Sequence, residues 1–129
     1  MSAKKNVLVG AHMSIAGGFY KAIERGQAVG CTAIQMFTKS NRQWHAKPIT
    51  KKEAEQFQAT LQTSTIESVV AHASYLINVG SPKKETALRS RTALIKELER
   101  CHILGIRRLI LSLVVIDRPL LLVVKIHDL

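Results

Sequence analysis

The chain has 129 residues, 47% of them hydrophobic, and its 19 basic and 9 acidic residues give a formal charge of +10. The length and the apolar content fit a single globular domain with a core of its own. The two apolar runs near the C-terminus, 109–116 and 120–124, are far shorter than the ~20 residues of a membrane helix, which excludes a membrane span. The charge favours a polyanionic partner such as nucleic acid, with a generically basic protein as the alternative.

The two cysteines and the first residues bear on the compartment of the chain. Cys31 and Cys101 form no CxxC motif and no cluster with histidine, which indicates two reduced core thiols. The opening Met-Ser-Ala-Lys-Lys leads only into a short apolar strand, so no signal peptide is expected. We therefore expect a cytoplasmic protein.

Predicted strands and helices alternate along the chain. The apolar runs that predict strands cover residues 6–10, 31–37, 68–71 and 108–113. The helices predicted between them cover residues 19–28, 50–63 and 82–104. Thr50 with Glu53 is typical of a capping box, and Ser81 before Pro82 is typical of an N-cap. Gly105 is the expected C-cap of the third helix.

The third predicted helix carries an apolar stripe at helical spacing. Its members are Leu88, Leu94, Ile95, Leu98 and Cys101. Strands and helices alternating at roughly 30-residue spacing predict right-handed βαβ units and a parallel sheet. About three and a half such units do not close an eight-stranded barrel. The pattern is therefore that of the front of a larger α/β fold.

Each of the first three predicted strands ends in polar residues. The groups are His12-Met13-Ser14, Lys39-Ser40-Asn41-Arg42 and His72-Ala73-Ser74-Tyr75. Because the carboxyl ends of parallel strands meet at one edge of a sheet, we expect the three groups to converge there. A neutral imidazole in such a place suits Zn²⁺, although a histidine after a strand is also commonly structural. No HxH or HExxH spacing supplies a second ligand, so further ligands must come from distant parts of the chain.

The polar run from Thr38 to Trp44 is the most distinctive of these groups. Its Arg, Asn and Gln side chains suit phosphates and base edges, because all three present hydrogen-bonding groups with fixed geometry. Tyr75 is suited to stacking on a base or sugar, or to ordinary packing. A solvated surface loop, with Arg42 paired to a helix carboxylate, is the alternative.

Three segments in order resemble successive signatures of the endonuclease IV family, the zinc-dependent apurinic/apyrimidinic endonucleases of base-excision repair. Residues 10–18 read Gly-Ala-His-Met-Ser-Ile-Ala-Gly-Gly, residues 37–44 read Phe-Thr-Lys-Ser-Asn-Arg-Gln-Trp, and residues 72–78 read His-Ala-Ser-Tyr-Leu-Ile-Asn. The resemblance covers about residues 6–111. It implies a TIM (β/α)8 barrel, of which this chain holds the N-terminal portion. It also implies hydrolysis of the phosphodiester 5′ to an abasic site in double-stranded DNA, leaving a 3′-hydroxyl.

The resemblance implies roles for individual residues. His72 matches a ligand of a cluster of three zinc ions, and Tyr75 matches an aromatic residue that enters the DNA at the abasic site. A loop that contacts the damaged DNA through the minor groove is matched by Ser40, Asn41, Arg42 and Gln43. His12 and Ser14 match a first loop near the DNA and are possible pocket residues.

The chain departs from the family pattern after Leu111. Where the family continues with His-Pro-Gly and another zinc-binding His, this chain has Ser112-Leu113-Val114, and His127 has no matching context. We expect a partial TIM barrel over 1–111 and an aberrant, out-of-frame apolar tail over 112–129. With one ligand of a three-zinc site, the chain alone is expected to be poorly stable and to lack endonuclease activity. A non-catalytic DNA-binding remnant and a fragment of a sugar isomerase-like barrel are the alternatives, and neither a protein partner nor a membrane is implied.

Overall fold

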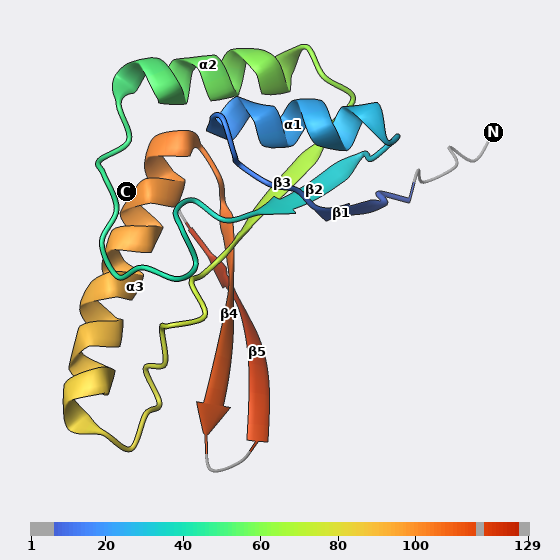
Figure 1. Ribbon diagram of the computed structural model, residues 1–129. Coiled ribbons are helices and arrows are strands. Elements are labelled where there is room, and N and C mark those ends of the chain that lie inside the picture. The colour runs from blue at the N-terminus through green and yellow to red at the C-terminus, as the bar shows by residue number, and fades with distance from the viewer. Residues whose placement is uncertain (1–6, 116–117, 127–129) are drawn as a thin grey trace.

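The computed structural model describes residues 7–115 and 118–126, and over these ranges it has one sheet with helices beside it (Figure 1). The strands are β1 (Gly10–His12), β2 (Ala33–Met36), β3 (Ser68–His72), β4 (Arg108–Val115) and β5 (Arg118–Lys125). The helices are α1 (Phe19–Ala28), α2 (Lys51–Gln62) and α3 (Lys84–Leu104). The strands lie in chain order, with β1 to β4 parallel and β5 antiparallel to β4. The predicted parallel βαβ arrangement is confirmed.

The three helices lie on one side of the parallel strands (Figure 1). This follows from topology, because right-handed crossovers between strands in sequential order carry every helix to the same face. The carboxyl ends of β1, β2 and β3 therefore open toward one edge of the sheet. The segment after β2 runs beside α3 before it reaches α2 (Figure 1).

The core lies between the helices and the sheet. Its fully buried side chains include Ile23, Met36, Phe57, Leu104 and Leu109. Gly26 brings α1 close to β2, because a Cβ atom at this position would lie nearer than 3.0 Å to Ile34 Cγ2. Close helix–sheet packing of this kind depends on the absence of a side chain.

Two predicted helix ends are confirmed in detail. Thr50 Oγ1 accepts a hydrogen bond from the Glu53 N–H at 3.1 Å, and the Glu53 carboxylate accepts one from the Thr50 N–H at 2.8 Å. This is the reciprocal capping box expected before α2. Gly105 ends α3 in the left-handed conformation, with φ of 76°, which favours glycine. The cysteines are free and buried, as predicted.

The first strand lies later than the sequence predicts. Residue 6 is outside the described ranges, and residues 7–9 precede β1, with Val7 80% and Val9 66% exposed. The sheet ladder begins at Gly10 because its partner on β2 is Ala33, the first residue of that strand. His12 is therefore the last residue of β1 and not a residue beyond its end.

Helix α3 also differs from its prediction. It begins at Lys84, two residues later than expected, and its N-cap Lys83 makes no side-chain capping bond. Leu88 and Ile95 of the predicted apolar stripe are 52% and 58% exposed. The buried face consists of Ser90, Glu97, Cys101 and Leu104. Leu94 and Leu98 of the stripe are partly buried against the core and Cys101 is fully buried, so the stripe is confirmed in part. The prediction omitted Ser90 and Glu97, because their burial depends on hydrogen bonds to backbone groups of the segment after β3, which hydrophobic spacing alone does not indicate.

The second apolar run of the tail forms β5. All eight residues of β4 pair with β5, from Arg108 with Lys125 to Val115 with Arg118. No strand was predicted for this run, which was assigned only to the aberrant apolar tail. The division at residue 111 and the out-of-frame origin of 112–129 stay predictions, and His127 lies outside the described residues.

Within the described ranges, none of the helices combines the length and the apolar character needed to cross a membrane.

Candidate functional site

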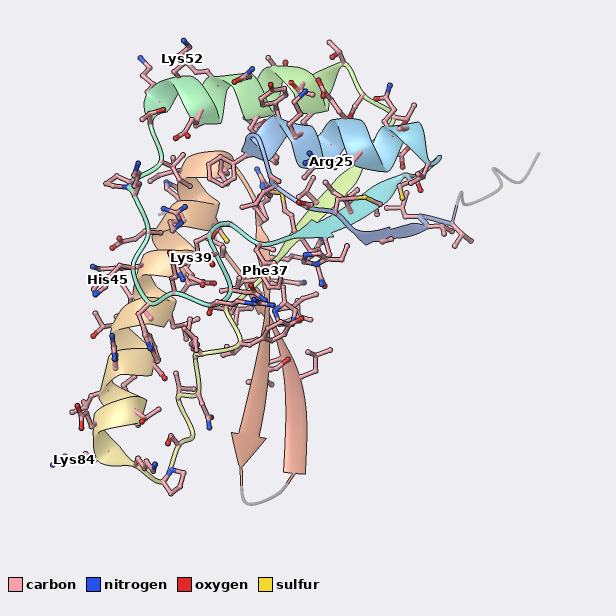
Figure 2. All side chains as sticks on the ribbon, viewed as in Figure 1. Arg25, Phe37, Lys39, His45, Lys52 and Lys84 are labelled. Carbon is pink, nitrogen blue, oxygen red and sulfur yellow. The ribbon has the colours of Figure 1, made fainter. Side chains whose placement is uncertain are left out.

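Four aromatic rings meet where β1, β2 and β3 end. Phe37 is the central ring, with centroid distances of 4.5 Å to His12, 5.7 Å to His72 and 5.6 Å to Tyr75. The rings of His72 and Tyr75 lie 5.3 Å apart. These are typical distances for interacting aromatic pairs. Figure 2 shows Phe37 beyond the end of β2. The structure thus brings Phe37 together with residues from two of the three polar groups, His12 from the first and His72 and Tyr75 from the third, with His72 buried and Tyr75 66% exposed.

The tautomer of His72 follows from its hydrogen bond to the backbone. Nδ1 lies 2.6 Å from the carbonyl oxygen of Ala73. Because a carbonyl only accepts, Nδ1 carries the proton and Nε2 keeps a free lone pair when the ring is neutral. Histidines that bind metals commonly use this arrangement, in which a backbone carbonyl orients the ring. Nε2 lies 3.5 Å from the hydroxyl oxygen of Ser112 on β4.

His12 is held beside this ring in a different way. Its Nδ1 lies 2.9 Å from the side-chain amide nitrogen of Gln35. Burial lowers the pKa of His12 below its usual range, and repulsion from a protonated His72 lowers it further. The lowered pKa favours the neutral form of the His12 imidazole.

The family resemblance implies bound zinc, so we ask whether these side chains could coordinate it. The described residues contain no group of three or more His, Cys, Asp or Glu side chains arranged to hold a metal ion. Two imidazoles without a carboxylate do not fit a cluster of zinc ions. His72 offers one suitable donor, Nε2, and the set around it is incomplete. The described side chains therefore do not form a complete metal centre.

The run after β2 presents side chains outward while its backbone carbonyls point inward. Ser40, Arg42 and Gln43 are exposed and Asn41 is half-buried. The buried ammonium group of Lys39 donates to the carbonyl oxygens of Ser40, at 2.9 Å, and Gln43. Figure 2 shows Lys39 on the inner side of this segment. The Arg42 guanidinium is thus directed to solvent from a backbone that is held from behind.

A second set of bonds joins this run to the segment after β3 and to α3. Ser74 Oγ donates to the Asn41 carbonyl oxygen at 2.9 Å. Arg100 Nε donates to the Thr38 carbonyl oxygen at 3.1 Å, and its Nη1 donates to the Lys47 carbonyl oxygen at 2.7 Å. Nη2 of the same guanidinium also donates to Thr38. Residues 38–47 are hereafter called the clamped loop.

Glu97 lies beneath the clamped loop and is 1% exposed. Its Oε1 accepts a hydrogen bond from the Ser74 N–H at 3.0 Å, whereas Oε2 has no hydrogen-bond partner among the described residues. Burial raises the pKa of Glu97, and the backbone bond and the charges of Lys39 and Arg100 oppose this rise. Burial correspondingly lowers the pKa of Lys39. Each of the three side chains binds backbone groups of the loop or of the segment after β3, and their charges influence one another's pKa values.

A cavity of about 330 Å³ separates part of the clamped loop from α3. Trp44 and His45 line it from the loop, and Leu88, Arg89 and Lys96 line it from the helix. The guanidinium of Arg89 lies 4.5 Å from the centroid of the Trp44 ring, a cation–π distance. The loop is therefore held by a few polar and cation–π contacts across a space that side chains do not fill.

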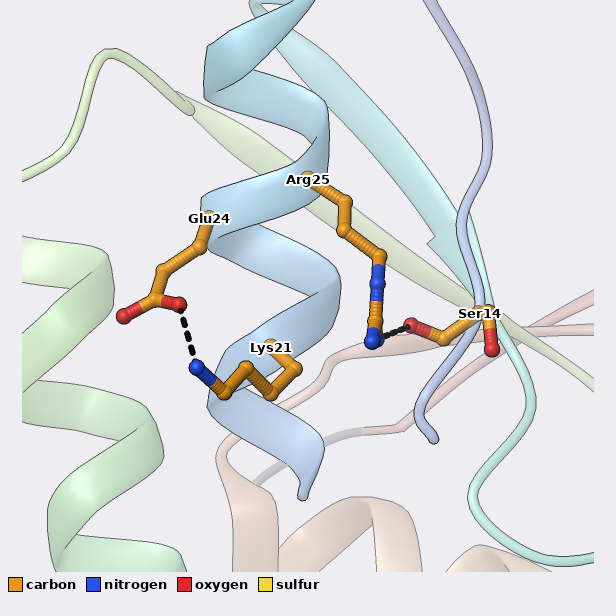
Figure 3. A network of polar contacts seen from close by, with 4 residues as sticks. All are labelled: Ser14, Lys21, Glu24 and Arg25. Carbon is orange, nitrogen blue, oxygen red and sulfur yellow. Dashed lines mark hydrogen bonds and ion pairs between the residues drawn. The ribbon is translucent and has the colours of Figure 1, made fainter. Parts of the chain in front are cut away.

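The first loop, after β1, is positioned by α1. Arg25 donates to the Ser14 carbonyl oxygen at 2.8 Å, and Lys21 pairs with Glu24 at 3.2 Å on the same helix (Figure 3). The exposed Ser14 hydroxyl accepts a hydrogen bond from the Ala16 N–H at 3.1 Å. Ser14 thus shapes its own turn, while His12 is the residue of this segment that reaches the ring cluster.

Sequence reasoning missed Glu97 and Arg100 as parts of the site, and it named Ser74 in the third polar group without giving it a role. A signal for Glu97 was present, because it stands four residues before Cys101 and seven before Leu104 on the buried face of α3. A charged residue within a buried stripe requires polar partners. The partners of these side chains could not be identified from the sequence. Arg100, for example, binds carbonyl groups 62 and 53 residues earlier in the chain.

Comparisons with known proteins agree with this architecture. Residues 23–120 match the family described as xylose isomerase-like TIM barrel. Probable endonuclease 4 from Protochlamydia amoebophila is 43% identical over 104 residues, covering 81% of this chain and 37% of that protein. Probable endonuclease 4 from Halorhodospira halophila is 48% identical over 101 residues, covering 78% and 34%. The chain therefore spans about a third of the length of these curated relatives.

Solved structures give the same result. The crystal structure of endonuclease IV from Thermus thermophilus matches with a TM-score of 0.74 and 36% identity, covering 80% of this chain and 39% of that one. D-psicose 3-epimerase from Clostridium cellulolyticum matches with a TM-score of 0.53 and 14% identity, which supports the fold alone. The predicted resemblance to endonuclease IV and the partial TIM-barrel fold are confirmed, and the chain belongs to the xylose isomerase-like TIM-barrel family.

Proposed function

We propose that this chain is the DNA-recognition part of an apurinic/apyrimidinic endonuclease of the endonuclease IV type. In this proposal it binds double-stranded DNA at abasic sites and does not cleave it alone. The observation that carries the proposal is the placement of two exposed side chains, Arg42 and Tyr75, at the carboxyl edge of the parallel strands. The hydrogen bond from Ser74 to Asn41 joins the two segments that carry them. The names of the similar proteins support the same class of activity.

The chemistry of these side chains suits a damaged duplex. Arg42 offers a planar set of donors for phosphate oxygens, and the neighbouring Ser40 and Gln43 offer further polar contacts. Tyr75 presents an aromatic ring that can occupy the space left by a missing base and stack on its neighbours. An abasic site is the favoured target, because it has the least stacking and pairing to lose when the duplex is opened. The formal charge of +10 favours the DNA backbone as a partner.

Metal binding enters the proposal at one residue only. The endonuclease 4 family uses metal ions, and we propose that His72 supplies one zinc ligand through Nε2, the nitrogen opposite the one bound to Ala73, which the Ser112 hydroxyl approaches to 3.5 Å. The described residues do not complete the set. We therefore expect binding without hydrolysis from this chain.

Fluorescence anisotropy with two duplexes of the same sequence tests the proposal. One duplex carries a tetrahydrofuran abasic analogue and the other is intact. We expect tighter binding to the abasic duplex, with affinity falling as salt rises from 50 to 200 mM, a range in which about 10³-fold losses accompany six or more phosphate contacts. Tyr75→Ala should weaken binding to the abasic duplex about 5- to 150-fold, the equivalent of losing one stacked base.

The contribution of the Arg42 charge to DNA affinity can be tested with a matched control. Arg42→Ala should lower the affinity for both duplexes and reduce the salt slope by about 1. Lys52→Ala removes the same charge from the exposed surface of α2, well away from Phe37 and Lys39 (Figure 2), and should change the affinity little. Equal affinity for the two duplexes, or equal effects of the two substitutions, would contradict the proposal. EDTA-sensitive cleavage of the abasic duplex by the purified chain would overturn the expectation of no hydrolysis.

A further inference from the structure

The conformation of the clamped loop depends on a single arginine that contacts both of its ends. Arg100 donates to the carbonyl oxygens of Thr38 at the start of the loop and Lys47 near its end. The intervening backbone has further inward bonds from Lys39 and Ser74. Because a guanidinium has several donors in a rigid planar fork, one side chain can fix the separation and direction of two carbonyl groups.

The surroundings of Arg100 show that this role is not ordinary packing. A cavity of about 330 Å³, lined by Trp44 and His45 from the loop and by Glu97 from the helix, separates part of the loop from α3, so apolar contacts do not fix the loop along its whole length. Glu97, one turn earlier on α3, accepts a hydrogen bond from the Ser74 N–H. Ser74 in turn donates to Asn41. The network therefore reaches the loop at its ends and at its middle.

We propose that Arg100 is a positioning residue: it fixes the clamped loop before DNA arrives, so that the Arg42 side chain is presented without an ordering cost on binding. The part of this inference that concerns DNA rests on the proposed function above. A loop that is already ordered in the free protein loses little conformational entropy when DNA binds. Its ordering therefore raises the affinity without adding a contact to the ligand.

Hydrogen exchange measured by mass spectrometry in the free protein tests the clamp directly. Arg100→Lys keeps the charge beside Glu97 but replaces the planar fork with a single ammonium group, and Ser74→Ala removes one neutral bond to the loop. Amides of residues 39–46 should exchange at least about tenfold faster in Arg100→Lys, with a smaller increase in Ser74→Ala. Amides of α1 should be unchanged. Arg91→Lys, at an exposed arginine of the same helix, is the matched control and should leave the loop unchanged.

Binding of the tetrahydrofuran duplex provides the second measurement. Arg100→Lys should weaken binding about 3- to 30-fold without changing the salt slope, because no phosphate contact is lost. Unchanged loop exchange in both variants, or an equal rise throughout α1, would overturn the clamp. Faster loop exchange with unchanged DNA affinity would overturn its role in recognition. If the wild-type chain binds no DNA, the proposed function fails, whereas loop exchange still decides whether Arg100 fixes the loop.

Discussion

Gly26 offers a substitution whose effect depends on one identified contact. Replacing it with alanine places a Cβ atom nearer than 3.0 Å to Ile34 Cγ2, 3.4 Å from Ile66 Cδ1 and 3.7 Å from Cys31 Cβ. The last two distances are tolerable, whereas the first is not, since carbon atoms pack at about 3.5–4.0 Å. Ile34 cannot easily move, because it is 2% exposed and its strand is paired with β1 on one side and β3 on the other.

Two opposing free energies decide the outcome of Gly26→Ala. Alanine in a helix is favoured over glycine by about 0.5–1 kcal/mol, because it restricts the unfolded chain and has the higher helix propensity. Overpacking of a core costs about 1–3 kcal/mol. The clash involves a β-branched side chain with a stiff χ1, so we expect the cost of overpacking to exceed the gain from alanine. The free energy of unfolding should fall by about 1–2 kcal/mol.

Urea denaturation followed by circular dichroism measures this change, provided that the slope with urea is the same for both proteins. Ile34→Ala removes the clashing methyl group and supplies the control background. In that background Gly26→Ala should be neutral or stabilising by about 0.5–1 kcal/mol, although Ile34→Ala itself costs about 2–5 kcal/mol. An increase in stability from Gly26→Ala alone, or the same loss in both backgrounds, would refute the packing argument.

Three further predictions concern other parts of the chain. Thr50→Ala removes the capping box and should lower the free energy of unfolding by about 1 kcal/mol in urea, and Glu53→Ala should then add little more. The pKa of His12 in the folded protein is below its usual value of 6.5, so between these two pKa values the unfolded chain binds more protons than the folded one. The free energy of unfolding should therefore fall as the pH drops below 6.5. Urea midpoints at pH 7.5 and 5.5 measure this loss, which should shrink in His12→Gln; an equal loss in both proteins would argue against it. Burial raises the pKa of Cys101 to about 12, so iodoacetamide at pH 8 should label it, by mass spectrometry, only after unfolding. Rapid labelling of Cys101 in the native protein would contradict its burial.

The local features of the fold were predictable from the sequence because they depend on neighbouring residues. The capping box of Thr50 and Glu53 is complete within four positions, and Gly105 ends its helix for a conformational reason that holds in any fold. The convergence of polar groups at the ends of three strands follows from the parallel topology once the strands are recognised. These features need no knowledge of the tertiary partners.

The features that the sequence did not reveal depend on such partners. Ser90 is buried on α3 because its hydroxyl accepts a hydrogen bond from the Asn78 N–H, and Glu97 because it accepts one from Ser74. Hydropathy assigns both residues to solvent, so the predicted stripe omitted them and included the exposed Leu88 and Ile95. The bonds of Arg100 are to carbonyl groups, which every residue carries, so no residue type marks its partners.

The antiparallel pair of β4 and β5 has a consequence for the order in which the molecule folds. The paired residues of β4 and β5 are close in sequence, and the nearest pair is Val115 with Arg118. In contrast, all of α3 lies between Ala71 and Leu109, which pair in the parallel ladder of β3 and β4. Local antiparallel pairs form in about 1–10 μs, and pairings across long loops are slower. Because β4 pairs with β3 at only two positions and with β5 along its whole length, β4 and β5 should dock on β3 as a preformed unit. Ser112 would then reach His72 in one of the last steps of folding, and the most distinctive histidine of the chain would gain its surroundings late.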